Sequence, residues 1–345
     1  FSYAAFANLT VYEEPGGKLA AFDMAALRGT VTQSFDTLYK TAMPHRAASV
    51  GLMGAARYVL MGEGRKGVLV GQGGWLFTAE EARPLPQDLM TSVRHIAEVN
   101  DYLASKGTRL VLIPIPAKVD VEAANANQPE LSAEMAAFYA GFVADLKGDQ
   151  IAMVDARTPL VALAKTDRAY FATDTHWTLA GASAVATAVA QSGLVKLGTA
   201  QTTRKDLPAK SFAGDLISYV TSADLAADIG LPPEQAKPYL VDAASGDAGD
   251  IFAATAVDVV LVGTSYSANP DWSFAEALKL SLHSDVLNVA EQGLGPVTPL
   301  DTYLKSDSFR DAPPKVLIWE FPLRYLTDPK LWDGHKIGEV LASAD

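Results

Sequence analysis

The sequence predicts an open, doubly wound α/β sheet that is mainly parallel and flanked by helices. Short apolar, β-branched segments recur along the chain, and several are apolar at every position, as at 110–113 (LVLI) and 259–262 (VVLV). A continuously apolar run suits a strand that is covered on both faces, as in a parallel sheet. Amphipathic segments of helical length separate these runs, and this alternation is typical of a doubly wound sheet.

The individual elements follow from these patterns. We expect strands at 67–70, 109–115, 151–155, 258–262, 286–289 and 315–321, and helices at 87–105, 131–146, 179–191 and 272–282. In the first helix, apolar residues recur at spacings of three and four, which marks one buried face: Leu89, Val93, Ile96, Val99 and Leu103. Ligands of doubly wound sheets bind beyond the carboxyl ends of the strands, so a site is expected there.

Two segments depart from the alternation. Residues 1–66 carry helical patterns at 24–39 and 47–60 but no strong strand, so we expect an N-terminal helical elaboration packed on the core. The α/β domain then spans 67–345. Within it, 194–250 is rich in Gly, Pro, Asp and Ala and predicts a long irregular insertion. Long loops of this kind are usually functional or mobile.

Composition excludes several classes of function. The net charge of the 345 residues is −12, which opposes binding to nucleic acid and to anionic lipid; an acidic substrate would need a local basic cluster. Cysteine is absent, which excludes disulfides, thiolate metal sites and a cysteine nucleophile. No apolar run approaches the roughly 18–20 residues that span a bilayer, and Phe1 does not begin a recognisable signal peptide. We therefore expect a soluble portion of a protein, with any leader or anchor outside it.

A first motif, Asp174-Thr175-His176-Trp177, lies just before the helix expected from residue 179. An aspartate two residues before a histidine can fold back to accept the Nδ1 proton of the imidazole, which leaves Nε2 free as a base. From the motif alone, a surface helix cap and a metal site are alternatives. The other histidines show no ligand-like spacing: His45, His95, His283 and His335. We expect neither a metal nor a cofactor.

A second motif, Gly263-Thr264-Ser265, directly follows the buried run that ends at Val262. In a sharp strand-to-helix turn, glycine permits the tight backbone and the serine hydroxyl is exposed at the edge of the sheet. The helix dipole and the backbone N–H groups there favour the anion that forms on attack. Serine and threonine after a strand are also ordinary helix caps, which is the alternative for this motif alone.

A glycine-containing loop at 288–295 (NVAEQGLG) follows the next predicted strand. Its Gly293 can present an N–H group to a developing oxyanion, although such a glycine equally suits a plain turn. All three motifs fall at the carboxyl ends of predicted strands, where a doubly wound sheet brings them together. We therefore expect a catalytic triad of Ser265, His176 and Asp174.

Together with three further segments, these motifs resemble the SGNH hydrolase superfamily in the circularly permuted form of bacterial alginate O-acetyltransferases, the AlgJ/AlgX family. The further segments are 71–77 (GQGGWLF), 110–118 with its Pro-Ile-Pro-Ala-Lys ending, and 319–326 (WEFPLRYL). We expect the AlgJ type, because the chain ends soon after its last predicted strand and leaves no room for the carbohydrate-binding module of AlgX-type proteins.

The resemblance implies a role for each matching residue. Ser265 matches the family nucleophile, His176 the base and Asp174 the acid that orients the base. The backbone N–H groups of Ser265 and Gly293 match the oxyanion hole.

The sequence also departs from the superfamily pattern. Thr264 replaces the aspartate of Gly-Asp-Ser, and Asp-x-His shortens the usual Asp-x-x-His. Glu320-Phe321-Pro322 stands where the Gly-x-Asn-Asp block is expected. The third oxyanion donor is therefore open among three candidates: Asn288, Asn269 and Tyr266.

The function that the resemblance implies is transfer of an acetyl group, through an acetyl-serine intermediate, to mannuronate hydroxyls of alginate, with ester hydrolysis when water is the acceptor. A membrane-embedded acyl carrier protein would deliver the acetyl group in the periplasm, among other acetylation and secretion proteins. An N-terminal segment outside this chain would tether the protein to the inner membrane. A plain acetylesterase and a non-catalytic component of a polysaccharide assembly are the alternatives.

An anionic polymer that meets an acidic protein needs a basic patch near Ser265. Lys118 and Arg324, at the ends of predicted strands, are candidates for it, with solvated surface charges or structural ion pairs as the alternatives. Trp177 and Tyr266 are candidates for lining the sugar site, and a packed core position is the alternative for Trp177.

Overall fold

The structure, a computed structural model, describes residues 46–87, 89–244, 257–328 and 331. The chain divides into two compact units. The α/β unit comprises Gly67–Leu216 and Pro233–Asp345, and it contains all the predicted site residues. The helical unit comprises Phe1–Lys66 and Ile217–Pro232.

The α/β unit is built on a four-stranded parallel sheet with the order β3-β10-β8-β9. Its strands are β3 (Arg109–Ile115), β8 (Val259–Val262), β9 (Leu287–Asn288) and β10 (Val316–Pro322). Every residue of β8 and β10 is buried, as the continuously apolar sequence of β8 predicts; β10 is apolar except at Glu320. The predicted α/β class is therefore confirmed, and β10 lies between the strands that carry the other motifs.

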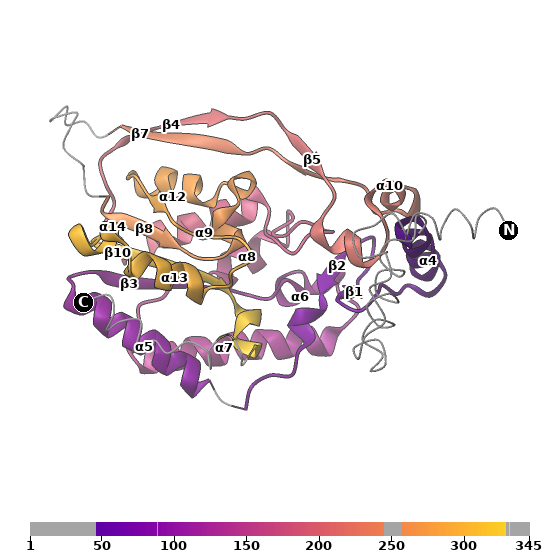
Figure 1. Cartoon of the computed structure of the whole chain (residues 1–345), viewed down its shortest axis with the longest axis horizontal. Coiled ribbons are helices and arrows are strands. Elements are labelled where there is room, and N and C mark those ends of the chain that lie inside the picture. The colour runs from indigo at the N-terminus through magenta and orange to yellow at the C-terminus, as the bar shows by residue number, and fades with distance from the viewer. Residues whose placement is uncertain (1–45, 88, 245–256, 329–330, 332–345) are drawn as a thin grey trace, which may run out of the picture. The chain divides into compact units, whose positions relative to one another are not determined.

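Helices lie on both sides of these strands. Figure 1 shows α5 (Met90–Ser105) and α7 (Pro129–Gly148) on one side, and α9 (Leu179–Gln191) and α12 (Phe274–Leu282) on the other. The predicted apolar face of α5 is buried against the core at four of its five positions: Val93, Ile96, Val99 and Leu103. The predicted bounds of α9 agree with the structure because a side-chain cap, Thr178, marks its start.

Shorter elements complete the α/β unit. They are β1 (Val68–Val70) paired antiparallel with β2 (Leu76–Thr78), and the helices α6 (Lys118–Val121), α8 (Arg157–Leu163), α11 (Ser265–Ala268), α13 (Val297–Leu304) and α14 (Asp307–Asp311).

The strand predicted at 151–155 is wrong. This segment makes a single parallel bridge, between Met153 and Leu112. Two backbone hydrogen bonds flank it, from Leu112 to Ala152 and from Val154 to Leu112, each 2.9 Å long. The segment touches the outer edge of β3 for one residue pair only, and its apolar sequence does not reveal how far pairing extends.

The insertion predicted to be irregular contains two antiparallel strand pairs. β4 (Gln201–Asp206) pairs with β7 (Tyr239–Ala244), and β5 (Lys210–Phe212) pairs with β6 (Glu234–Ala236). The sequence of β4, QTTRKD, is polar and almost wholly exposed, so it carries no apolar alternation by which a strand is recognised. Its partner strand, β7, begins more than thirty residues later in the chain, so the pairing is not a local property of the β4 sequence.

The helical unit contains α4 (Arg46–Met61), which agrees with the helix predicted at 47–60, and α10 (Ala223–Ala226). The hydroxyl of Thr221 donates a hydrogen bond to the carbonyl of Gly51 at 2.9 Å. A Cβ atom at Gly54 would lie 2.0 Å from the carbonyl oxygen of Val220, so α4 packs on this segment with backbone against backbone. The helix predicted at 24–39 lies outside the described residues. In the described part of the chain, no helix has both the length and the apolar character that a membrane crossing needs.

Candidate active site

Ser265 occupies the turn that connects β8 to α11. Thr264 precedes the helix as its N-cap, and its hydroxyl accepts the backbone N–H of Tyr266. Ser265 is the first residue of α11, so its own N–H lies in the first helical turn, where backbone donors have no partner within the helix. The serine is only partly buried, unlike its neighbours on either side. The turn thus presents a hydroxyl together with an N–H group that can face an oxyanion.

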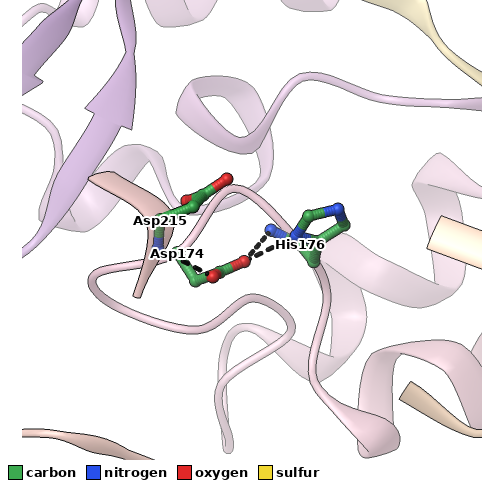
Figure 2. A group of neighbouring side chains, drawn as sticks. All are labelled: Asp174, His176 and Asp215. Atoms are coloured by element: carbon green, nitrogen blue, oxygen red, sulfur yellow. Dashed lines mark hydrogen bonds and ion pairs between the residues drawn. The ribbon is translucent and has the colours of Figure 1, made fainter. Parts of the chain in front are cut away.

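His176 reaches this hydroxyl from a loop held by α9 and by an isolated bridge between Tyr170 and Trp177. Its Nε2 atom lies 2.7 Å from Oγ of Ser265, and its Nδ1 atom lies 2.6 Å from Oδ1 of Asp174. The same carboxylate oxygen accepts the backbone N–H of His176 at 2.9 Å, which explains how a spacing of two residues suffices (Figure 2). The three residues form one hydrogen-bonded chain, with the geometry of a serine nucleophile, a base and an orienting acid.

Asp215 is a fourth member of the cluster, and no motif in the sequence points to it (Figure 2). Its carboxylate accepts the backbone N–H of Thr175 at 2.8 Å and the hydroxyl of Thr175 at 2.5 Å. Its own backbone N–H donates to Oδ2 of Asp174 at 3.0 Å. Asp215 therefore fixes both Asp174 and the residue between Asp174 and His176.

The two carboxylates differ in acidity. Burial by itself raises the pKa of Asp174, but hydrogen bonds from His176 and the attraction of its ring outweigh burial, and the pKa is lowered. Burial and the neighbouring charge of Asp174 raise the pKa of Asp215, against the hydrogen bonds from Thr175. Asp174 is thus the carboxylate that stays ionised beside the imidazole, as an orienting acid must.

Asp174, His176 and Asp215 are also close enough to be considered as metal ligands, since one atom of each lies within 4.8 Å of the others. All four carboxylate oxygens, however, already accept an N–H or O–H group: from His176, from the Asp215 backbone, and twice from Thr175. These hydrogens point at the oxygens that a cation would need. The arrangement suits proton transfer better than metal binding.

Two aromatic rings pack against the imidazole. The ring centroids of Trp272 and His176 are 5.3 Å apart and nearly stacked, and those of Tyr266 and His176 are 4.7 Å apart. The His176 side chain keeps 12% of its surface exposed. The imidazole is therefore held in place by its neighbours while part of its surface remains exposed.

Lys118, expected in a basic patch, lies in the core with 1% of its surface exposed. Its ammonium donates to three backbone carbonyls, of Leu76 at 2.6 Å, Asp174 at 2.9 Å and Ala172 at 3.0 Å. All three of its hydrogens are used, so a direct contact with a polymer is not compatible with this placement. Instead, Lys118 holds the loop that carries Asp174.

The other candidates for substrate binding are buried as well. Arg324 is 7% exposed, and its guanidinium pairs with Glu80 at 3.0 Å and donates to the hydroxyl of Tyr266 at 3.3 Å. Tyr266 is 1% exposed and donates to the carbonyl of Thr175 at 2.6 Å. Trp177 is fully buried and packs on Tyr266 and Phe274. Trp177 thus occupies a packed core position, and Arg324 forms a structural ion pair. Both are alternatives that the sequence left open.

The loop that follows β9 lies against the serine turn. The backbone N–H of Glu291 donates to the carbonyl of Gly263 at 3.2 Å, and Gly293 is exposed two residues further on, with a φ of 77°. Among the candidates for a third oxyanion donor, Asn288 donates its amide to Ser267 at 2.8 Å. The hydroxyl of Tyr266 donates to Thr175, and Asn269 accepts the N–H of Asp271 with its side-chain oxygen. The amide of Asn288 and the hydroxyl of Tyr266 thus already have partners.

Comparison with known proteins identifies the family. The family described as "SGNH hydrolase-like domain, acetyltransferase AlgX" matches residues 68–323. A protein named "Probable alginate O-acetylase AlgJ" from Pseudomonas syringae pv. tomato is 34% identical over 336 residues, which cover 94% of this chain and 86% of that protein. The chain belongs to the AlgJ/AlgX family. This confirms the resemblance found in the sequence.

Solved structures of the AlgJ/AlgX family share the fold. The "O-Acetyltransferase Domain of Pseudomonas putida AlgJ" superimposes with a TM-score of 0.68 at 30% identity and covers 80% of this chain and 99% of that one. AlgX of Pseudomonas aeruginosa gives a TM-score of 0.63 at 24% identity, covers 80% of this chain and 67% of that one, and supports the fold alone.

Proposed function

We propose that this chain is a serine-dependent O-acetyltransferase that acetylates hydroxyls of alginate. The observation that carries the proposal is the continuous hydrogen-bonded chain from Asp174 through His176 to Ser265, with links of 2.6 and 2.7 Å. Membership of the AlgJ/AlgX family supports the acetyl group and the alginate acceptor.

In the first half-reaction, Nε2 of His176 takes the proton of Ser265 as Oγ attacks the carbonyl carbon of an acetyl ester. Asp174 stabilises the imidazolium that forms. The N–H groups of Ser265 and Gly293 hold the oxyanion, and each such donor contributes about 3–4 kcal/mol. His176 then passes its proton to the departing oxygen, which leaves an acetyl ester on Ser265.

In the second half-reaction, a sugar hydroxyl gives its proton to His176 and attacks the acetyl-serine. The products are the acetylated polymer and the regenerated Ser265. Water in place of the sugar gives acetate, so the same residues perform transfer and hydrolysis. The outcome depends on which acceptor occupies the site and on how well water is excluded.

Recognition of an anionic polymer requires an exposed cation, because the whole chain carries a charge of −12. We assign this role to Lys210 on β5, whose side chain is 53% exposed and pairs with Asp271. Asp271 directly precedes Trp272, the residue stacked on His176, and Trp272 packs on Phe212 of β5. Lys210 therefore replaces Lys118 and Arg324 as the proposed contact with uronate carboxylates.

The family further supports a periplasmic reaction, in which a membrane-embedded acyl carrier supplies the acetyl group and other acetylation proteins take part.

The proposal is tested with an acetyl donor and oligomannuronate, with products weighed by mass spectrometry. Wild-type protein should add acetyl groups to the oligomer, and Ser265→Ala should not. Both proteins should show the same thermal unfolding profile. Acetate release at the same rate with and without the oligomer would identify an acetylesterase. Unchanged ester cleavage by folded Ser265→Ala would remove the serine mechanism.

A further inference from the structure

Glu320 is a buried carboxylate directly beneath the serine turn. β10 and β8 are parallel and in register, with Trp319 opposite Val262. Glu320, the next residue of β10, therefore lies beside Gly263, the first residue after β8, at the level of the turn. Glu320 is completely buried. Tertiary pairing thus places a carboxylate between the end of the central strand and the residues that flank Ser265.

The carboxylate makes three hydrogen bonds, all to this turn. Oε2 accepts the backbone N–H of Thr264 at 3.0 Å and the hydroxyl of Ser267 at 2.6 Å. Oε1 accepts the hydroxyl of Thr264 at 2.9 Å. Thr264 and Ser267 lie on either side of Ser265, so one side chain holds the turn at both ends. The geometry is that of a clamp on the serine.

Gly263 is required for this contact. A Cβ atom at Gly263 would lie 2.4 Å from Oε2 of Glu320 and 2.8 Å from its carbonyl oxygen. Neither distance can be accommodated without movement of the carboxylate or the strand. The glycine before the Thr264-Ser265 pair therefore makes room for the carboxylate, in addition to permitting a tight turn.

A gain in folding stability does not explain why a carboxylate occupies position 320. Burial raises the pKa of Glu320, whereas hydrogen bonds from Ser267 and Thr264 and the attraction of His176 lower it, and burial is the larger effect. Among the described ion pairs, none involves Glu320. A buried carboxylate without a cationic partner is costly, even when it is hydrogen-bonded.

We propose that Glu320 is a positioning residue, which holds Oγ of Ser265 at hydrogen-bonding distance from His176 by clamping Thr264 and Ser267. Glu320 does not contact the reacting atoms. The inference depends on the proposed function, because it assigns Glu320 to the serine chemistry. It also gives a role to the Glu-Phe-Pro segment that replaces the Gly-x-Asn-Asp block of the superfamily.

The test uses Glu320→Gln, which keeps the volume of the side chain and its acceptor for Thr264 N–H. It replaces the acceptor of the Thr264 hydroxyl by an amide donor. Ser267→Ala removes one bond of the clamp without touching Glu320. Glu122→Gln is the matched control, since Glu122 is a buried carboxylate, 3% exposed, that accepts two backbone N–H groups, from Ala169 and Tyr170.

Two readouts are combined. The first is hydrolysis of an aryl acetate, where a displaced serine should lower kcat about 10- to 100-fold in Glu320→Gln, with KM changed by less than about twofold. The second is the ¹⁵N resonance of His176 Nε2, which reports whether the ring accepts a hydrogen bond from Ser265. It should move in Glu320→Gln toward its position in Ser265→Ala. Ser267→Ala should change both readouts in the same direction and by less, and Glu122→Gln should change neither.

A wild-type kcat in Glu320→Gln, or a reduced kcat with an unmoved His176 resonance, would overturn the proposal. If Ser265→Ala cleaves the ester as wild type does, the serine mechanism fails independently. In that case the ¹⁵N resonance of His176 Nε2 in Glu320→Gln is the only readout that tests whether Glu320 positions Ser265 against His176.

Discussion

The backbone N–H of Asp215 donates to Oδ2 of Asp174, the carboxylate oxygen that His176 does not use. The Asp174 carboxylate is therefore bonded on both oxygens, one toward the imidazole of His176 and one toward a second aspartate that also holds Thr175. Asp174 has little freedom to rotate, so the imidazole keeps one orientation even though its loop has no regular secondary structure.

Replacement of Asp215 by Asn tests this support. The hydrogen bond from the backbone N–H of residue 215 to Asp174 remains. One of the two carboxylate oxygens that accept hydrogen bonds from Thr175, however, is replaced by an amide NH₂ donor. We expect kcat for an aryl acetate to fall about 5- to 10-fold, the equivalent of one hydrogen bond of about 1 kcal/mol. Asp206→Asn, at an exposed aspartate on β4, is the control and should leave kcat unchanged. Equal rates in the two variants would contradict a supporting role for Asp215.

Asp174→Asn tests the acid itself. Asparagine has nearly the same shape, but its amide cannot stabilise an imidazolium and favours the wrong tautomer of the histidine. We expect kcat to fall about 10⁴-fold while the fold is retained. Stopped-flow or long-incubation ester hydrolysis measures this range, and circular dichroism checks the fold. Loss of less than tenfold would show that Asp174 is not the orienting acid.

Gly293→Ala tests the proposed oxyanion donor. Gly293 and Gly107 have φ angles of 77° and 79°, and neither has an atom within 4 Å of an added Cβ. Alanine at either position should cost about 1 kcal/mol through backbone strain alone. Gly107 precedes β3, at the amino end of the sheet, away from the site. Alanine keeps the backbone N–H of residue 293, but it disfavours the left-handed φ that aims this N–H at the oxyanion. We therefore expect equal losses of stability in the two variants and a lower kcat in Gly293→Ala alone, about tenfold or more.

Lys210→Ala tests polymer recognition. The loss of an exposed cation beside Trp272 should raise KM for oligomannuronate, while kcat for a small, uncharged aryl acetate stays at the wild-type value. Lys147→Ala is the control, because Lys147 is an exposed lysine on α7, on the other side of the central strands (Figure 1). The effect should also weaken with added salt, as expected for a partly exposed charge. An unchanged KM would remove Lys210 from the polymer site.

Lys118 should leave a signature in the pH dependence of stability. Burial lowers the pKa of Lys118 from 10.5 to about 8, in part offset by the charge of Glu81 and other carboxylates. Below pH 8 the lysine is protonated in both the folded and the unfolded chain. Between about 8 and 10.5 the unfolded chain binds more protons, so this residue makes the free energy of unfolding rise with pH.

The comparison is between wild type and Lys118→Met. The variant loses the donor to three carbonyls and should be less stable at pH 7. It also lacks the rise between pH 8 and 10.5, so the difference from wild type should widen by up to about 3 kcal/mol across that window. Urea unfolding at pH 7, 8, 9 and 10 measures it. A constant difference would mean that the folded protein does not alter the acidity of Lys118.

The sequence by itself determined the fold class, the family and several of the local elements. Strand 109–115 and helix 179–191 agree with the structure because hydrophobic period and capping are local properties of the chain. The Asp174-x-His176 contact could also be anticipated, since two residues in one turn can meet without help from the rest of the fold.

Tertiary structure decided what surrounds each charged side chain. Lys118 and Arg324 appear in the sequence as cations at strand ends, yet their partners are carbonyls and carboxyl groups from distant segments. No motif marks Asp215, and the sequence marks Glu320 only as a departure from the superfamily pattern, because one enters from the insertion and the other meets the serine turn through register between parallel strands. Burial and hydrogen-bond partners depend on long-range packing, and one residue's chemical type does not specify which segment will cover it.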